Sequence, residues 1–255
     1  MKRALTIAGS DSGGGAGIQA DLKTFQRFEV FGMSALTLVT VQNTQTVSAV
    51  HLLPPDLVLA QIDAVVDDLG VDATKTGALG SPEIVERVAF AVRRHKIAPL
   101  VVDPVMVSKH GSPLCGPETA QALVKELFPL AALVTPNAHE AKALLGGTVA
   151  TEAEAREAAR ALQAMGPRAV VVKNVGTGEE SIDVLFDGRE MHCFATPRLE
   201  TRNDHGTGCT FSAAITALLA RGVAVPAAVA QAKAYVAKAM ESAPDLGHGH
   251  GPVRH

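Results

Sequence analysis

The sequence predicts an α/β fold in which helices cover both faces of a mostly parallel sheet. Short apolar, strand-like runs alternate with longer amphipathic segments along the whole chain, and such alternation favours parallel strands joined by helices. Two strand-like runs flank the turn signal Asp187-Gly188, so an antiparallel hairpin is expected at one edge. Because no linker, repeat or low-complexity segment interrupts the pattern, residues 1–255 are expected to form a single domain.

The predicted strands are short runs dominated by apolar residues. In chain order they cover residues 3–8, 33–41, 71–76, 99–103, 131–135 and 168–173, followed by the hairpin runs 181–186 and 190–195. In the predicted helices, apolar residues recur every three or four positions, as Ile18, Leu22 and Phe25 do. These helices cover residues 16–28, 56–69, 81–95, 116–128, 137–145, 151–165, 207–221 and 226–240.

The overall composition argues against several classes of partner. The chain has a formal net charge of -3 and no long basic block, which argues against nucleic-acid binding. No apolar run reaches the roughly 18 residues of a membrane span, and the N-terminal apolar run is too short for a secretory signal. The three cysteines are widely spaced without a CxxC pair. This spacing predicts neither a disulfide framework nor a zinc site, and we expect a cytoplasmic protein.

The segment 205–210 reads HGTGCT and stands directly before an Ala/Leu-rich helical run. Glycines let backbone N–H groups approach a ligand, and the first N–H groups of a helix have no partner within it. These features favour an anion, such as a transferring phosphoryl group, at Gly206, Thr207 and Gly208. Cys209 lies in the same positive field, which is expected to lower the pKa of its thiol. The alternative is a glycine turn with a small buried cysteine.

Further polar residues follow the predicted strands, at the edge where parallel sheets bind ligands. Asp103 could hold Mg²⁺ or balance phosphates, or could simply form a turn before Pro104. Asn137 and Glu140 lie three apart at a helix start, which suits either Mg²⁺ held through waters or a capping box. Lys173 ends another strand and could reach a nucleotide phosphate or remain solvated.

Two glycine-rich segments complete the pattern. Residues 12–17 read SGGGAG and lead into a helix, but no G-K-[ST] follows, so the segment is a flap, an anion nest or a turn rather than a P-loop. Near the same rim, Asp21 and Gln42 could read the nitrogens of a heterocycle or lie on the surface. The tail 247–252 reads GHGHGP and is expected to be a flexible terminus rather than a metal site.

Together these motifs resemble those of the hydroxymethylpyrimidine/phosphomethylpyrimidine kinases, a thiamine-biosynthesis family of the ribokinase superfamily. The matching segments occur in the same order along nearly the whole chain. They are AGSDSGGGAGIQADLKT at 8–24, QNT at 42–44, VDPVM at 102–106, TPN at 135–137 with Glu140, the segment 201–210 with its HGTGC core, and the tail 249–253.

The resemblance implies a single ribokinase-like domain with three layers, α/β/α, that works as a homodimer. It implies that the chain uses ATP and Mg²⁺ to phosphorylate 4-amino-5-hydroxymethyl-2-methylpyrimidine on its hydroxymethyl group. The monophosphate is then converted to the pyrophosphate, which enters thiamine diphosphate biosynthesis. The implied partners are therefore small molecules, with no nucleic acid and no membrane.

The resemblance also implies roles for individual residues. Cys209 stands where sugar kinases carry an aspartate base, and residues 206–208 form the anion hole. The residues implied to contact the pyrimidine are Gly9, Asp21, Gln42 and Val105. The residues implied to bind the nucleotide are Lys173, Asn137 and Thr207. The residues implied to hold Mg²⁺, through water, are Asp103 and Glu140.

Two segments depart from the family pattern. The family often carries Lys-Gly-Gly-His where residues 173–176 read KNVG, which alters the loop expected beside the nucleotide. Many relatives carry Gly-Met-Leu where residues 77–79 read GAL, which alters the packing expected over the pyrimidine. A pyridoxal kinase of the same superfamily is therefore an alternative function. A nucleotide-binding regulator is a second alternative, although a protein that only binds needs no catalytic base such as Cys209. A dinucleotide-binding protein is disfavoured, because no G-x-G-x-x-G is evident.

Overall fold

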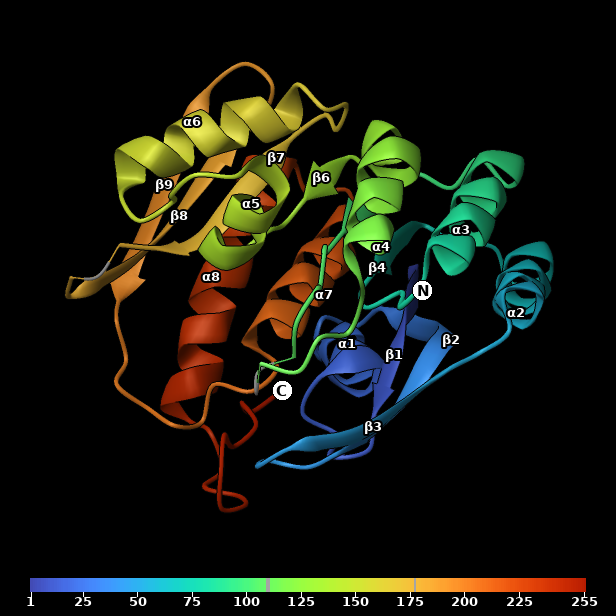
Figure 1. Ribbon diagram of the computed structural model, residues 1–255, viewed down its shortest axis with the longest axis horizontal. Helices are drawn as coiled ribbons and strands as arrows, with labels where there is room; N and C mark the ends of the chain where they lie inside the picture. The colour runs from blue at the N-terminus through green and yellow to red at the C-terminus, as the bar shows by residue number, and fades with distance from the viewer. Residues whose placement is uncertain (109–110, 177) are drawn as a thin grey trace.

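In the computed structural model, which describes residues 1–108, 111–176 and 178–255, the strands form one sheet (Figure 1). The strands are β1 (Arg3–Asp11), β2 (Phe31–Gln42), β3 (Val47–Leu52), β4 (Ala73–Thr76), β5 (Leu100–Val102), β6 (Leu133–Val134), β7 (Val170–Val175), β8 (Glu180–Phe186) and β9 (Met191–Pro197). Their order across the sheet is β3-β2-β1-β4-β5-β6-β7-β8-β9. Strands from β2 to β7 pair in parallel, and the sheet becomes antiparallel at both edges. The predicted mostly parallel sheet with an edge hairpin, β8–β9, is confirmed.

The helices lie on both faces of the sheet, which gives the predicted three layers (Figure 1). They are α1 (Gly17–Arg27), α2 (Pro55–Asp68), α3 (Pro82–Arg94), α4 (Pro117–Ala122), α5 (Ala138–Leu145), α6 (Glu152–Gln163), α7 (Thr207–Ala220) and α8 (Val225–Glu241). Helices α1, α7 and α8 cover one face, and α2 to α6 cover the other. Side chains alternate along β1 accordingly: Leu5 and Ile7 pack on the α2–α6 side, and Ala4 packs with α1 and α7.

Local sequence signals fix the starts of several helices. Ser81, Asn137 and Thr151 each accept a hydrogen bond from the backbone three residues on, which satisfies an N–H group that the helix itself cannot. The predicted helix 116–128 is not continuous: α4 ends at Ala122 and is followed by a π-helical turn, Leu123–Leu127, and a 3₁₀ turn, Phe128–Leu130. Pro129, which has no N–H to donate, lies in that last turn.

Two segments differ from the prediction. Strand β3 was not predicted; most of its residues are exposed, and its short polar-interrupted run Val47–Leu52 pairs antiparallel with β2. The tail 247–252, predicted to be flexible, is instead packed. The backbone of His250 donates to the carbonyl of Thr44 at 2.7 Å, and Pro252 forms a bridge with His205. The tail glycines allow this close approach, since a Cβ at Gly249 would overlap the carbonyl group of Thr44.

Candidate active site

The carboxyl ends of the parallel strands meet at one edge of the sheet, where they border a cavity of about 890 Å³. This is the edge at which such sheets bind ligands. The predicted site residues that line the cavity are Gly9, Gln42, Asp103, Val105, Asn137, Glu140, Lys173, Gly206, Thr207, Gly208 and Cys209. The fold therefore gathers residues that are far apart in the sequence, and Asp21 is the one predicted site residue that does not line the cavity.

The N-terminus of α7 presents the glycine motif to the cavity. Gly206 caps the helix in a left-handed conformation, with φ 84°, and a Cβ there would overlap the carbonyl of Gly15. Only glycine fits this position, which brings the loop after β1 directly against the helix start. The N–H groups of the first turn have no acceptor within the helix, so this end of the cavity is suited to an anion.

Cys209 lies in the first turn of α7, but its thiol is not activated in the way the sequence suggested. Burial raises the pKa of Cys209 to about 12, although the Lys75 ammonium and the backbone N–H of Gly17 both lower it. The carboxylates of Asp21 and Asp103 raise it further. The expectation of a lowered pKa is therefore wrong, because desolvation outweighs the positive field of the helix end. The protonated thiol is the main form at neutral pH.

Asp21 lies beneath the site rather than in it. Its carboxylate accepts from the Lys75 ammonium at 2.8 Å and from the Thr6 hydroxyl at 2.6 Å, and all three residues are 0% exposed. Helix α1 turns the Asp21 side chain into the layer between helix and sheet, outside the cavity lining, and its contact with the substrate stays a prediction. Burial raises the pKa of Asp21, against the opposing effect of Lys75. The single lysine in the otherwise uncharged strand β4 was the sequence signal for this pair.

A second aspartate–lysine pair lies at the cavity wall. Lys173 donates to Oδ1 of Asp103 at 3.0 Å, Thr135 donates to the same oxygen at 2.9 Å, and Ser212 donates to Oδ2 at 3.0 Å. Burial alone would lower the pKa of Lys173, but the carboxylates of Asp103 and Glu140 outweigh it, so the pKa is raised and the ammonium is charged. A fixed cation is thus presented to the cavity.

Asn137 and Glu140 form the capping box that the sequence left as one alternative. Glu140 donates its backbone N–H to Oδ1 of Asn137 at 2.9 Å, and Asn137 donates to Oε2 of Glu140 at 2.8 Å. Burial raises the pKa of Glu140 to about 7; Lys173 opposes this shift and Asp103 adds to it. Both residues also line the cavity, so capping does not remove them from contact with a ligand.

The carboxylates of Asp103 and Glu140 suit a metal ion that takes most of its ligands from water and the nucleotide. Among the described residues, no group of three or more His, Cys, Asp or Glu is arranged to hold a metal. Asp103 already accepts three hydrogen bonds, and one oxygen of Glu140 is used by the cap. This donor set fits Mg²⁺, which keeps waters and nucleotide phosphates as ligands and needs only one or two carboxylates from the protein.

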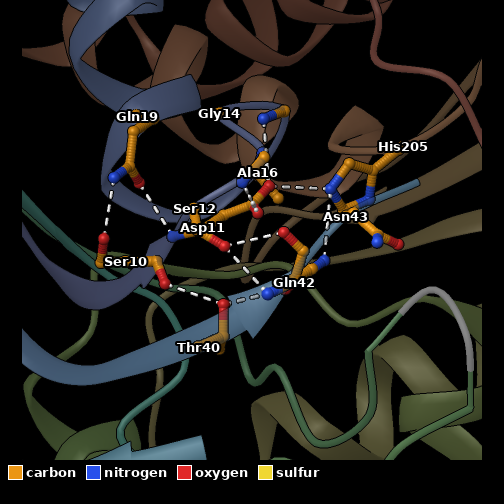
Figure 2. Close-up of polar contacts among 12 residues, drawn as sticks. Ser10, Asp11, Ser12, Gly14, Ala16, Gln19, Thr40, Gln42, Asn43 and His205 are labelled. Atoms are coloured by element: carbon orange, nitrogen blue, oxygen red, sulfur yellow. Dashed lines mark hydrogen bonds and ion pairs between the residues drawn. The ribbon is translucent and has the colours of Figure 1, made fainter. Parts of the chain in front are cut away.

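A polar cluster at the other end of the cavity was missed from the sequence (Figure 2). Asp11 accepts from the backbone N–H groups of Gly13, Gly15 and Ala16 at 2.8–3.0 Å, and its Oδ2 lies 2.9 Å from Nε2 of His205. Burial would raise the pKa of Asp11, but these hydrogen bonds outweigh it and hold the pKa below its usual value. The ionised carboxylate therefore ties the glycine-rich loop to the segment that precedes α7.

Gln42 joins the same cluster from the end of β2. Its backbone exchanges hydrogen bonds with the Ser12 hydroxyl at 2.7 and 2.9 Å, and its side-chain amide lies between Thr40 and His205 (Figure 2). His205 directly precedes the glycine motif, and Asp11 ends β1 directly before the glycine-rich segment. The position of these two residues beside the two glycine-rich segments was the available signal.

The end of β7 and the residues beyond it are contacted by the side chain of Arg198. Asn174 has φ 57°, a conformation that asparagine tolerates better than most residues. The guanidinium of Arg198 donates to the carbonyls of Gly176 at 2.7 Å and Gly178 at 3.0 Å, and to Oδ1 of Asn174 at 3.3 Å. Arg198 and Asn174 line the cavity, so the departing segment KNVG still borders the ligand space.

Comparison with known proteins identifies the family. The phosphomethylpyrimidine kinase family model matches residues 11–254. The chain belongs to this family and is a kinase. It is 49% identical to the hydroxymethylpyrimidine/phosphomethylpyrimidine kinase of Mycobacterium bovis over 98% of this chain and 92% of that protein. It is also 48% identical to the thiamine biosynthesis bifunctional protein ThiED of Geobacter sulfurreducens over 98% of this chain, but it spans only 51% of that longer protein.

A solved structure supports the ribokinase-like fold. The pyridoxal kinase of Bacillus subtilis, solved as an ADP complex, superposes with a TM-score of 0.92 and 42% identity, over 100% of this chain and 97% of that chain. Together with the sheet order and the three layers, this confirms the predicted fold class and supports the use of ATP. Among the described residues, no helix combines the length and the apolar character needed to cross a membrane.

Proposed function

We propose that this chain transfers the γ-phosphoryl group of ATP to 4-amino-5-hydroxymethyl-2-methylpyrimidine, and then to its monophosphate, in thiamine diphosphate biosynthesis. One observation carries the proposal: a single cavity joins an amide suited to a heterocycle, Gln42, to an anion-binding helix end with Cys209 and a fixed cation, Lys173. Acceptor, transferring group and donor therefore have complementary partners in one space. The family match of residues 11–254 supports the same substrate class.

The residues divide the work by their chemistry. Gln42, Gly9 and Val105 receive the heterocycle. Lys173, Asn137 and Thr207 bind the triphosphate. The list of cavity-lining residues includes all six. Phosphoryl transfer is accelerated mainly by positioning and electrostatic stabilisation. The backbone N–H groups of residues 206–209 stabilise the negative charge on the transferring group.

Cys209 accepts the proton of the substrate hydroxyl as its thiolate. Because burial raises its pKa to about 12, the thiolate is the minor form at neutral pH. The rate of the first transfer should therefore increase with pH as the thiolate fraction grows. The second acceptor is an anionic phosphate, which needs no base, so the second transfer should depend less on Cys209.

Mg²⁺, bound with the nucleotide, would neutralise charge on the triphosphate, and Glu140 and Asp103 are the carboxylates that would hold it through water. Asp103 accepts a hydrogen bond from Lys173 at 3.0 Å, and the negative charges of Asp103 and Glu140 both raise the pKa of Lys173. Removing Mg²⁺ with a chelator should abolish turnover, and adding Mg²⁺ back should restore it.

We also propose that the chain forms a homodimer through the β2–β3 ribbon. Val39 and Val41 lie on one face of β2 and are 39% and 60% exposed, and an exposed apolar strand surface favours association. Sedimentation should give a dimer for the wild type and a monomer for Val41→Asp. The three cysteines are free thiols, as suits the cytoplasmic location that we propose.

Pyridoxal phosphorylation is the second candidate, because a pyridoxal kinase shares the fold at 42% identity. Ala78, where many family members carry methionine, lines the cavity, and this smaller side chain alters the packing expected over the heterocycle. ADP release should be measured with the pyrimidine, its monophosphate and pyridoxal as separate acceptors. The proposal predicts turnover of both pyrimidines with higher kcat/KM than pyridoxal, and preference for pyridoxal would overturn it.

A further inference from the structure

The glycine-rich segment that follows β1 is wrapped around a carboxylate of the chain itself. The carboxylate of Asp11 accepts at 2.8–3.0 Å from the N–H groups of Gly13, Gly15 and Ala16. The carbonyl of Asp11 accepts at 2.9 Å from the N–H of Gly14. Successive N–H groups that point into one concavity form an anion nest. Asp11 already fills this nest, so its N–H groups are not available to a phosphate of the ligand.

The filled nest lies against the start of α7 and contacts it at three places. Oδ2 of Asp11 lies 2.9 Å from Nε2 of His205 (Figure 2). The carbonyl of Gly15 lies so close to Gly206 that a Cβ on Gly206 would overlap it. Farther along both segments, the N–H at the start of α1 lowers the pKa of the Cys209 thiol. The contacts follow the same order along both segments, so the glycine-rich segment forms a continuous seat for the first turn of α7.

The contact between Asp11 and His205 is a buried hydrogen bond to a charge. The hydrogen bonds of the nest and of His205 lower the pKa of Asp11, so its carboxylate is ionised and can only accept. Nε2 of His205 therefore donates, and the two residues are only 4% and 5% exposed. Such charge-assisted bonds are stronger than neutral ones. Asp11 also borders the cavity, but the partners of its carboxylate lie within the chain, so it acts through His205.

The C-terminal tail holds His205 from the other side. The backbone N–H of His205 donates to the carbonyl of Gly251 at 3.0 Å, and its carbonyl accepts from the N–H of Val253 at 3.3 Å. A Cβ on Gly15 would crowd both the imidazole and Pro252, so the ring is enclosed between the glycine-rich segment and the tail. The residue directly before Gly206 is therefore fixed by contacts from outside its own helix.

We infer that the glycine-rich segment is a seat for the anion hole, and that Asp11 is the positioning residue that joins the two. Its carboxylate holds the segment on one side and His205 on the other, and this sets where the N–H groups of residues 206–209 point. The inference rests on the proposed function, in which those N–H groups stabilise the transferring phosphoryl group. A displaced anion hole should therefore slow the transfer step and leave the binding of ATP and acceptor nearly unchanged.

The test separates the transfer step from binding. Asp11→Asn keeps the size of the side chain but removes its charge and sets an NH₂ group against at least one donor. Its kcat should fall about tenfold to hundredfold, as expected when a catalytic group is displaced by up to about 1 Å, and KM for ATP and for the pyrimidine should stay near the wild-type values. His205→Phe keeps a ring but removes the N–H, and should give the same split. His95→Phe, at a His–Asp contact of 2.6 Å between α2 and α3, is the matched control and should keep the wild-type kcat.

A variant without any change in charge tests the same seat. Gly15→Ala leaves Asp11 and His205 in the chain but places a methyl group against the imidazole, so kcat should again fall while KM stays near the wild-type value. Gly116→Ala is the control, because a Cβ there meets nothing within 4 Å. A normal kcat in Gly15→Ala would contradict the seat.

Two further results distinguish positioning from a general structural role. Calorimetry should show that Asp11→Asn binds ADP as the wild type does, but binds ADP with aluminium fluoride, a mimic of the transferring group, more weakly by the factor lost in kcat. The double variant Asp11→Asn/His205→Phe should lose no more than the worse single variant, because both act through one contact.

Three outcomes would overturn the inference. They are an unchanged kcat in Asp11→Asn, multiplied losses in the double variant, and fewer binding sites with wild-type affinity for the mimic, which would indicate partial unfolding. A wild type that phosphorylates neither pyrimidine would instead overturn the proposed function.

Discussion

Two buried aspartate–lysine pairs lie near the start of α7, and they differ in what can reach them. Asp21 and Lys75 are 2.8 Å apart with both side chains 0% exposed, whereas Asp103 and Lys173 are 3.0 Å apart and line the cavity. The sealed pair can influence a reaction only through its charge and packing. The open pair can contact a ligand. Access, rather than the chemistry of the pair, therefore distinguishes a structural ion pair from a functional one.

The largest expected effect concerns Cys209, on which both pairs act. Its pKa is lowered by Lys75 and raised by both aspartates. Cys209→Ala should lower kcat for the hydroxymethyl acceptor by about 10²–10⁴-fold, the usual contribution of a general base. Nucleotide affinity should change little, because Lys173 and the helix end remain. Single-turnover ADP release measures the change in rate, and calorimetric titration measures the nucleotide affinity.

The pH profile sharpens this prediction. Below a pKa of about 12 the thiolate fraction increases about tenfold per pH unit, so wild-type kcat should increase from pH 7 to pH 9. Cys209→Ala should lose that dependence. The defect in Cys209→Ala should also be smaller with the monophosphate as acceptor. A normal rate in the variant would remove Cys209 from the base role.

The next effect separates the two pairs by stability. Lys75→Met leaves the Asp21 carboxylate buried without its cation, which should lower the free energy of unfolding by about 3–5 kcal/mol. Asp21→Asn in the same chain removes the stranded charge and should recover most of that loss. Urea unfolding measures both, with Lys125→Met at an 80% exposed lysine as control. A double variant as unstable as Lys75→Met would contradict the paired-charge account.

Lys173→Met should act on activity more than on stability. Removing one fixed electrostatic partner of a transferring phosphoryl group typically lowers the rate by about 10²–10³-fold, and we expect kcat/KM for ATP to fall by that order. Asp103 keeps its hydrogen bonds from Thr135 and Ser212 and borders a cavity that admits water. The loss in free energy of unfolding should therefore be smaller than in Lys75→Met. Equal stability losses would show that the two pairs are equally sealed.

The smallest expected effect is the pH dependence from Glu140. Its pKa is raised from an ordinary value of 4.5 to about 7, so the folded state holds its proton longer than the unfolded chain does. The associated stability is present below pH 4.5 and is lost as the pH increases through 7, by up to about 3 kcal/mol. Glu140→Gln keeps the cap geometry and should lack this loss. Urea unfolding from pH 4.5 to 8, in the presence of a chelator, compares the wild type with Glu140→Gln. If the free energy of unfolding changes with pH in the same way in both proteins, the raised pKa of Glu140 is contradicted.

The sequence predicted most of the fold because the signals were local. Alternating apolar runs located eight of the strands, and cap residues such as Ser81 and Thr151 located helix starts. Strand β3 escaped because it is exposed and polar-interrupted, so its pairing with β2 rather than its own pattern forms it. The packed tail escaped because glycine and histidine alone do not reveal an acceptor such as the Thr44 carbonyl.

The candidate site was predictable where residues end strands and less so where burial decides. Asp103 follows β5, Gln42 ends β2 and Lys173 lies near the end of β7, and all three reach the cavity as expected. The position of Asp21 outside the cavity lining was not predictable, because a carboxylate on a helix gives no sign of the lysine in β4 that meets it, 54 positions away. The pKa of Cys209 was predicted in the wrong direction, because the helix end is visible in the sequence but the desolvation around the thiol is not.

One measurement tests the contrast between the two pairs most directly: calorimetric titration of ATP into Lys173→Met and into Asp21→Asn/Lys75→Met. The open pair is predicted to contact the nucleotide, so Lys173→Met should weaken ATP binding strongly, while the double variant should bind it as the wild type does. Wild-type affinity in Lys173→Met together with lost affinity in the double variant would contradict this account.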